Sequence, residues 1–157
     1  MTAPMLERRR VEAEILGLVY DELKAEFDAD TAKRLITSAV RKSAIAQGKL
    51  LAEQAGGETS MEAFKQFQPL WSAGGTLEVE PGPQGEDYYE FKVTRCQYSE
   101  MYKDMGLAEL GFTLSCNRDG TMCEGYDSKL KLARTQTIMD GADYCDFKFT
   151  YGDQEDS

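Results

Sequence analysis

The stretch "TIMDGADYCDFKFTYG", residues 137–152, indicates how the C-terminal half of this chain folds. Its first part, "MDGAD", is rich in turn-forming residues, and "CDFKFTY" then alternates apolar with polar side chains. An alternation with a period of two is typical of a β-strand that buries one of its two faces. We therefore expect a final strand whose core-facing side carries Cys145, Phe147, Phe149 and Tyr151.

Three further segments have the character of strands. The segment "YYEFKVTRC", residues 88–96, alternates in the same way, and one of its faces carries Tyr89, Phe91 and Val93. The segments "TLEVE" (76–80) and "KLKLARTQTI" (129–138) also predict strands. Between them, residues 97–116 predict one or two short helices, and the turn-forming residues of "NRDGTMCEGYDS" (117–128) predict a loop.

The first half of the chain has helical periodicity instead. Residues 5–27 predict an amphipathic helix whose apolar face carries Val11, Ile15, Leu18, Val19, Leu23 and Phe27. Asp30 is a suitable N-cap for a second helix, which is expected to stop at Gly56 and Gly57. The capping-box spacing of "TSME" (59–62) then predicts a short helix that ends near Pro69.

Helices in the first half and strands in the second favour an α+β fold, with the N-terminal helices packed on a small, mainly antiparallel sheet. We expect residues 1–157 to form a single domain, because either half alone would bury little core. The helical half covers 1–73, and the strand-rich half, which carries the expected site, covers 76–152. Residues 153–157 form an acidic tail.

Composition excludes several classes of function. Eighteen Lys and Arg against 28 Asp and Glu give a net charge of −10, which disfavours binding to nucleic acid or to an anionic membrane. The chain has neither a membrane-spanning apolar run nor a targeting peptide, so we expect a cytoplasmic protein. It also has no histidine, so acid–base chemistry falls to carboxylates, tyrosines, lysines or thiols.

The four cysteines are spaced without a C-x-x-C pair, which disfavours a zinc ribbon or a thioredoxin-type site. Taken singly, each cysteine is expected to be a buried structural residue. Cys96, Cys116 and Cys145, however, lie at the ends of predicted elements, where functional residues concentrate. In "CNRD" the Cys116 thiol and the Asp119 carboxylate are close enough in sequence to act together, whereas Cys123 has no such setting.

Arg134 shares a face of its predicted strand with apolar side chains, so it is expected to point inward. A buried guanidinium needs a partner. One interpretation is an internal ion pair, for which the candidate carboxylates are Asp119, Asp143 and Asp146. The other is a bidentate fork for the carboxylate of a ligand. The same argument applies to Arg95, but it is weaker there because a side chain at the end of a strand can also reach solvent.

Four segments of the second half carry a resemblance to a known family: "RCQYSE", "LAELGFTLSCNRD", "LARTQTI" and "GADYCDFKF". In this order and with these gaps they resemble the L-2-amino-thiazoline-4-carboxylic acid hydrolase family. The positions that fall on the family's pattern are Cys96, Cys116, Asp119, Arg134, Thr135, Gly141, Cys145, Asp146 and Phe147. Cys123 is an addition of this chain.

The resemblance implies a small-molecule hydrolase that opens a cyclic amidine ring to a carbamoyl-cysteine. Combined with the analysis above, it suggests Cys116 or Cys145 as the nucleophile, Asp119 as the group that moves protons or orients water, and Cys96 as a residue lining the pocket. The substrate carboxylate would be held by Arg134, Thr135 and Arg95.

Two alternatives stay open at this point. No cofactor is certain, but a divalent metal is an alternative means of activating water, with the ligand set Cys96, Cys116, Asp119 and Cys145. The rival function is a non-catalytic sensor module that binds a small molecule or a metal with the same fold. The expected partner is a small substrate with a carboxylate, and the sequence leaves the formation of a homo-oligomer open.

Overall fold

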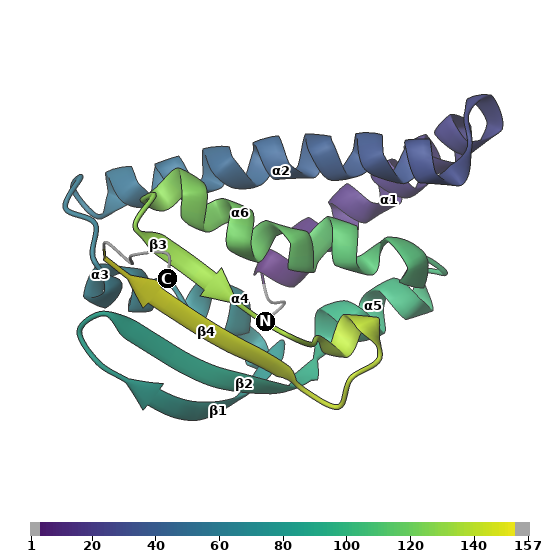
Figure 1. Cartoon of the computed structure of the whole chain (residues 1–157). Helices are drawn as coiled ribbons and strands as arrows, with labels where there is room; N and C mark the ends of the chain where they lie inside the picture. Colours follow the sequence, from purple (N-terminus) through teal and green to yellow (C-terminus); the bar gives the residue numbers. More distant parts are fainter. Residues whose placement is uncertain (1–3, 153–157) are drawn as a thin grey trace.

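The computed structural model describes residues 4–152, and it begins with a pair of long antiparallel helices (Figure 1). Helix α1 spans Pro4–Glu26 and α2 spans Ala29–Gln54. The N-cap of α2 is Asp28, two residues before the predicted Asp30, and its carboxylate accepts a hydrogen bond from the Thr31 N–H at 2.6 Å. The expected acidic tail, 153–157, lies outside the described residues.

Short elements connect this hairpin to a four-stranded sheet. They are α3 (Met61–Lys65), α4 (Pro69–Ser72) and the 3₁₀ turn η1 (Ala73–Gly75). The strands are β1 (Leu77–Gln84), β2 (Tyr88–Cys96), β3 (Leu130–Ala133) and β4 (Cys145–Tyr151). They pair in the order β1-β2-β4-β3, and every pair is antiparallel. Helices on one face of an antiparallel sheet confirm the predicted α+β fold (Figure 1).

Side chains along β2 and β4 alternate between the two faces of the sheet, and those on the inner face form an aromatic surface. Phe91 pairs with Phe147 and Val93 pairs with Cys145 across the two strands. The rings of Phe91 and Phe147 stack with centroids 4.9 Å apart at an interplanar angle of 12°. Cys145 therefore lies on the core side of β4, as the alternation of apolar and polar residues in this segment predicts.

Between β2 and β3 the chain is helical almost throughout. It forms α5 (Gln97–Asp104), the 3₁₀ turn η2 (Ala108–Leu110), the π-helical segment η3 (Phe112–Cys116) and α6 (Asn117–Tyr126). The loop predicted over 117–128 is therefore wrong.

The glycines of this segment explain the error, because they serve close helix packing rather than turns. A Cβ on Gly125 would lie 2.1 Å from the carbonyl oxygen of Ile45, and a Cβ on Gly48 would lie 2.1 Å from that of Met122. Only glycine lets α6 and α2 approach this closely.

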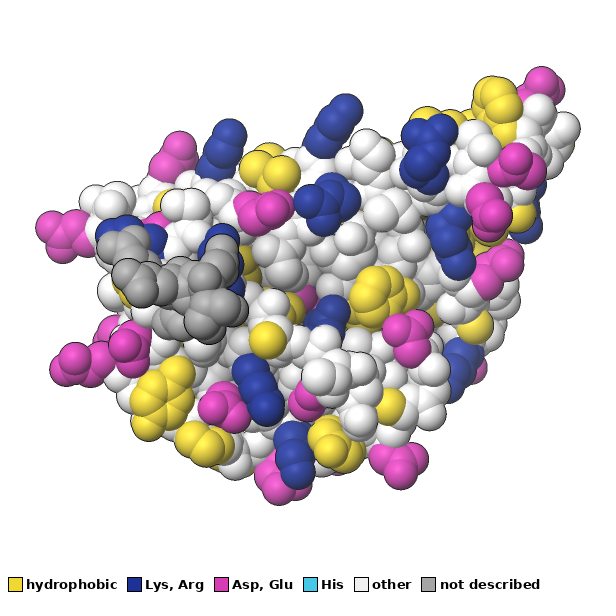
Figure 2. Space-filling view, viewed as in Figure 1, with side chains coloured by type: hydrophobic (Ala, Val, Ile, Leu, Met, Phe, Trp, Pro, Cys, Tyr) yellow, Lys and Arg dark blue, Asp and Glu magenta, His cyan; other side chains and the backbone are white. Residues whose placement is uncertain are grey.

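The predicted apolar face of α1 is also wrong, because most of it is exposed. The exposed fractions are 54% for Val11, 60% for Ile15, 64% for Leu18, 40% for Val19 and 53% for Phe27. Figure 2 shows hydrophobic side chains at the surface near the turn between α1 and α2. The buried face instead carries Arg9, Ala13, Gly17 and Tyr20. Close packing selects small side chains here, since a Cβ on Gly17 would lie 3.0 Å from the Leu107 side chain.

The strand predicted over 129–138 is shorter than expected. Strand β3 stops at Ala133, and the 3₁₀ turn η4 (Ile138–Asp140) follows before the left-handed Gly141 (φ 103°) leads toward β4. Arg134 thus leaves the sheet at the end of β3 and is free to turn toward α6. Within residues 4–152, no helix combines the length and the apolar character needed to cross a membrane.

Candidate functional site

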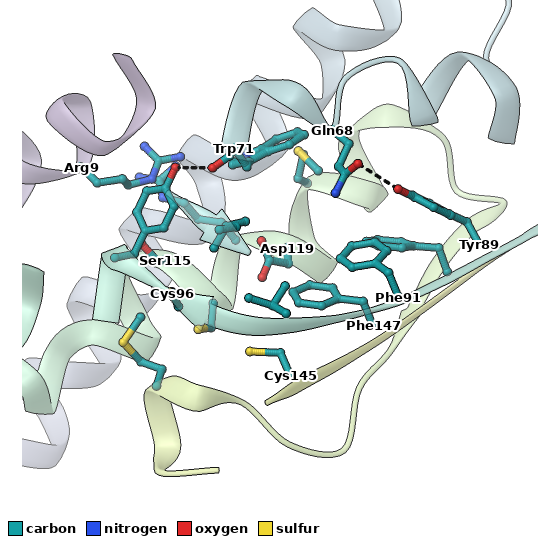
Figure 3. A pocket seen from close by; sticks show the side chains of 18 of the residues that line it. Arg9, Gln68, Trp71, Tyr89, Phe91, Cys96, Ser115, Asp119, Cys145 and Phe147 are labelled. Atoms are coloured by element: carbon teal, nitrogen blue, oxygen red, sulfur yellow. Dashed lines mark hydrogen bonds between the residues drawn. The ribbon is translucent and has the colours of Figure 1, made fainter. Parts of the chain in front are cut away.

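A cavity of about 110 Å³ lies between the inner face of the sheet and the helices (Figure 3). This volume is several times the roughly 10–15 Å³ that one water molecule needs. Most of the lining is aromatic or aliphatic, contributed by Phe64, Trp71, Leu77, Tyr89, Phe91, Val93, Met122, Met139, Phe147 and Phe149. The lining side chains that carry chemistry are Arg9, Gln68, Cys96, Tyr98, Ser115, Cys116, Arg118, Asp119 and Cys145.

Asp119 and Arg134 form an ion pair at the wall of this cavity. The Nη1 of Arg134 donates to Oδ2 of Asp119 at 2.7 Å, and its Nη2 donates to the carbonyl oxygen of Cys116 at 3.0 Å. The guanidinium also lies over the Phe147 ring, 5.0 Å from its centroid. Of the three carboxylates proposed as partners from the sequence, Asp119 is therefore the one that Arg134 binds.

The Asp119 side chain is 30% exposed and lines the cavity. Burial raises its pKa, although the Arg134 guanidinium acts in the opposite direction. A carboxyl group with a raised pKa takes up a proton more readily than an ordinary aspartate does. Asp119 is thus suited to exchange a proton with a ligand in the cavity.

Three of the four thiols line the same cavity: Cys96, Cys116 and Cys145. Cys96 is the N-cap of α5 and accepts a hydrogen bond from the Ser99 N–H at 3.4 Å. Cys145 accepts one from the Ile138 N–H at 3.3 Å. Cys123 is buried on α6 and donates to the carbonyl oxygen of Asp119 at 3.3 Å, so it is a structural residue of the helix.

Burial raises the pKa of every thiol, to about 11 for Cys96 and about 12 for Cys123. It also raises the pKa of Cys116 and Cys145. For Cys145, the Ile138 N–H and the Arg134 guanidinium counteract this effect. All four groups are therefore neutral thiols at neutral pH, and a reaction at one of them requires removal of its proton.

Two buried arginines also line the cavity, and the sequence analysis did not identify them. Arg9 is 5% exposed and Arg118 is 8% exposed. Arg9 Nη1 donates to Oε1 of Glu12 at 2.8 Å, and Arg118 Nη2 lies 3.5 Å from the same oxygen. Arg118 also donates to the carbonyl oxygen of Leu114 at 2.9 Å.

Of the two arginines, only Arg9 has a signal in the sequence. Arg9 shares a helical face with the small residues Ala13 and Gly17, which is a sign of tight packing. Arg118 falls within 117–128, where turn-forming residues predict a loop, so the sequence does not indicate that it is buried.

The structure does not bring Thr135 or Arg95 to the cavity lining. Thr135 is exposed, and its N–H and its hydroxyl group both donate hydrogen bonds to the Asp146 carboxylate. It lines a second, more open depression, which Arg134 and Cys116 also line. Arg95 is half exposed and forms an ion pair with Glu100 at 3.1 Å. Neither contact involves the thiols or Asp119.

A metal centre built from the proposed ligand set is not assembled. Over the described range 4–152, no group of three or more Cys, Asp or Glu side chains is arranged to hold a metal ion. Cys96, Cys116, Asp119 and Cys145 line one cavity without converging on one point.

Comparison with known proteins identifies the family. No curated protein matches the chain significantly. Among solved structures, the crystal structure of the phenol-responsive sensory domain of the transcription activator PoxR with phenol is similar, with a TM-score of 0.51 and 14% sequence identity over 99% of this chain and 77% of that one. At this identity the similarity shows the fold alone. A family model described as L-2-amino-thiazoline-4-carboxylic acid hydrolase matches residues 8–149. Because this match covers nearly the whole chain, the protein belongs to the L-2-amino-thiazoline-4-carboxylic acid hydrolase family.

Proposed function

We propose that this protein is a hydrolase that opens a small cyclic amidine or a related heterocycle bearing a carboxylate. The observation that carries the proposal is that three thiols and Asp119 line one cavity. Thiols and carboxylates are the groups that hydrolysis needs in a chain without histidine. Membership of the family supports the reaction class.

The shape of the cavity wall supports a planar substrate. Phe91 and Phe147 stack nearly parallel, and Phe149 continues this surface with interplanar angles of 28° and 20° to the two rings. A flat aromatic wall favours a flat ring against it, because stacked and offset arrangements of π systems are attractive. Asp119 and Cys145 lie beside this wall in Figure 3, where the reacting atoms of such a ring would be placed.

Of the two candidate nucleophiles, Cys145 is favoured over Cys116. The Ile138 N–H bonded to its sulfur and the nearby Arg134 guanidinium both stabilise a thiolate. At Cys116, burial and then the negative charge of Asp119 disfavour the thiolate, the Arg134 guanidinium acts in the opposite direction, and no backbone N–H of residues 4–152 is bonded to the sulfur. The surroundings of the Cys145 sulfur therefore stabilise a thiolate better than those of the Cys116 sulfur do.

In the proposed reaction the Cys145 sulfur bonds to the amidine carbon while the thiol proton passes to Asp119. The bond from that carbon to the leaving ring heteroatom breaks, and Asp119 gives this atom its proton. Water then adds to the same carbon, the carbon–sulfur bond breaks, and Cys145 regains a proton. The oxygen of water becomes the carbonyl oxygen of a carbamoyl product, so one water molecule is consumed in total.

The decisive experiment measures turnover of 2-amino-thiazoline-4-carboxylate by the purified protein, with the product identified by mass spectrometry. We expect a carbamoyl-cysteine from the unmodified protein and a fall in kcat of roughly 10³-fold or more for Cys145→Ala. Cys123→Ala is the matched control, because Cys123 is buried on α6 and does not line the cavity.

Each contrary result points to a different error. Full turnover by Cys145→Ala with loss in Cys116→Ala would make Cys116 the nucleophile. Full turnover by both would refute cysteine chemistry at this site. A protein that opens none of a set of cyclic amidines would refute the hydrolase proposal.

A sensor function is the second candidate, and the mostly apolar lining with neutral thiols favours it. A phenol-responsive sensory domain has a similar fold, so a ligand-binding role without chemistry is compatible with this architecture. Calorimetry with phenol, run beside the turnover assay, separates the two candidates. Binding of phenol in the absence of any thiazoline turnover would support the sensor.

A further inference from the structure

Arg9 and Arg118 give one end of the cavity an excess of positive charge. Two guanidinium groups line the cavity, from Arg9 and Arg118, and a third, from Arg134, is bonded to the lining residue Asp119. Two carboxylates, Asp119 and Glu12, are the counter-ions of these three groups. Asp119 is the partner of Arg134. Glu12 is therefore the carboxylate that forms ion pairs with both Arg9 and Arg118.

Glu12 is a shared and incomplete counter-ion. One of its oxygens contacts Arg9 at 2.8 Å and Arg118 at 3.5 Å, and the other contacts the exposed Arg8 at 3.4 Å. Among residues 4–152, no other carboxylate lies within 4.0 Å of the nitrogens of Arg9 or Arg118. Burial and then the charge of Arg9 lower the pKa of Arg118 to about 10, which is the expected effect of two cations close together.

The positions of these groups divide the cavity into two ends. In Figure 3, Arg9 and Ser115 lie on one side of Asp119, and Tyr89, Phe91 and Phe147 lie on the other. The cationic end also offers the hydroxyl group of Ser115, which shares a hydrogen bond of 2.7 Å with Tyr102. Cys145 and Asp119 lie between the cationic end and the aromatic end.

We propose that Arg9 and Arg118 bind the carboxylate of the substrate, so that its ring extends past Asp119 onto the aromatic wall. A carboxylate supplies the negative charge that Glu12 provides only in part, and a guanidinium can bind it through two parallel hydrogen bonds. The identity of the substrate rests on the proposed function. The recognition of a small planar carboxylate does not, because it follows from the charge and shape of the cavity.

The test measures binding of two matched pairs of probes by calorimetry. Benzoate and benzamide differ in charge but hardly in shape, and 2-amino-thiazoline-4-carboxylate and 2-amino-thiazoline differ by the carboxylate. We expect the unmodified protein to prefer the carboxylate of each pair. Arg9→Gln and Arg118→Gln should each weaken carboxylate binding roughly 10- to 100-fold and leave the neutral probes nearly unchanged.

Two further variants distinguish binding from a structural role. Glu12→Gln removes the competing carboxylate and should therefore strengthen benzoate binding, whereas loss of a merely structural ion pair would not. Arg95→Gln is the matched control, because Arg95 is half exposed and does not line the cavity. Circular dichroism verifies that each variant is folded, and Arg9→Lys, which keeps a charge, replaces Arg9→Gln if that variant does not fold.

The results separate this site from the hydrolase proposal. Preference for benzoate that depends on Arg9 and Arg118, without turnover of any thiazoline, would support the carboxylate site and refute the hydrolase. Turnover with an unchanged KM in Arg9→Gln and Arg118→Gln would support the hydrolase and overturn the site. Equal binding of benzoate and benzamide, or no binding of either, would also overturn it.

Discussion

Arg134 uses its two terminal nitrogens for two different protein acceptors, Asp119 and the carbonyl oxygen of Cys116. The first contact fixes the orientation of the Asp119 carboxylate. The second bonds the Arg134 side chain to the last residue of the π-helical segment η3. Its guanidinium is also stacked over Phe147. We therefore interpret Arg134 as a positioning residue for Asp119.

The substitution Arg134→Lys tests this role. An ammonium group cannot make both contacts in the planar geometry of a guanidinium, so Asp119 should lose its fixed position. We expect kcat for the thiazoline substrate to fall roughly 10- to 100-fold, with KM changed less than threefold. Steady-state kinetics give both values. A large rise in KM at an unchanged kcat would instead mean that Arg134 holds the substrate carboxylate directly.

The thiols of the folded protein are expected to react slowly with an alkylating reagent at neutral pH. Burial raises the pKa of Cys96 to about 11 and also raises that of Cys145, while an ordinary cysteine has a pKa of about 8.5. Because only the thiolate reacts, the rate should increase about tenfold per pH unit from pH 7 to beyond pH 9. Mass spectrometry after timed exposure to iodoacetamide measures this rate for each cysteine.

The protein unfolded in urea is the reference for this experiment. There the rates should level off near pH 9, because the thiols regain their ordinary pKa. A cysteine of the folded protein that levels off below pH 8 would contradict the raised pKa. It would also identify a thiolate nucleophile already formed in the ligand-free cavity.

The contact between helices α2 and α6 holds the site in place. Helix α6 carries Arg118 and Asp119, and its close approach to α2 depends on Gly125 and Gly48. The site residues on α6 are therefore positioned by glycines that have no chemistry of their own.

Two glycines of the same helix provide a matched pair of substitutions. In Gly125→Ala the added methyl group would meet the Ile45 carbonyl oxygen at 2.1 Å, so the free energy of unfolding should fall by about 3 kcal/mol. In Gly120→Ala no atom lies within 4 Å of the new methyl group, so the helix should gain about 0.5–1 kcal/mol. Urea denaturation measures both. Equal effects of the two substitutions would contradict the close packing of α6 on α2.

The same elements show how far local patterns predict structure. The period of two predicts β2 and β4 correctly, because their alternating side chains meet a core on one face. Helix α6 was missed because glycines were interpreted as turn formers, whereas here they permit a close contact with a helix about 75 residues earlier in the sequence. The face of α1 was misassigned because a buried face of small residues gives no hydrophobic signal.

The protein as a whole is acidic, whereas the side chains around its cavity are mainly basic. The chain has a net charge of −10, yet arginines outnumber carboxylates around the cavity. An acidic surface repels other anions at long range, while the buried guanidinium groups act at short range on a ligand that has entered. Selection of a small carboxylate therefore depends on the interior of the protein and not on its overall charge.

The sequence alone predicts the class of the fold and the position of Cys145 on the core side of its strand, and the absence of histidine in it limits the possible chemistry. These properties follow from short-range periodicity and from composition. Long-range packing brings Arg134 to Asp119, keeps Thr135 and Arg95 away from the cavity lining, and places Arg9 beside Arg118 in that lining. Arg9 and Arg118 are 109 positions apart in the sequence. Their proximity arises from the packing of α1 against the helical segments after β2, which no local pattern encodes.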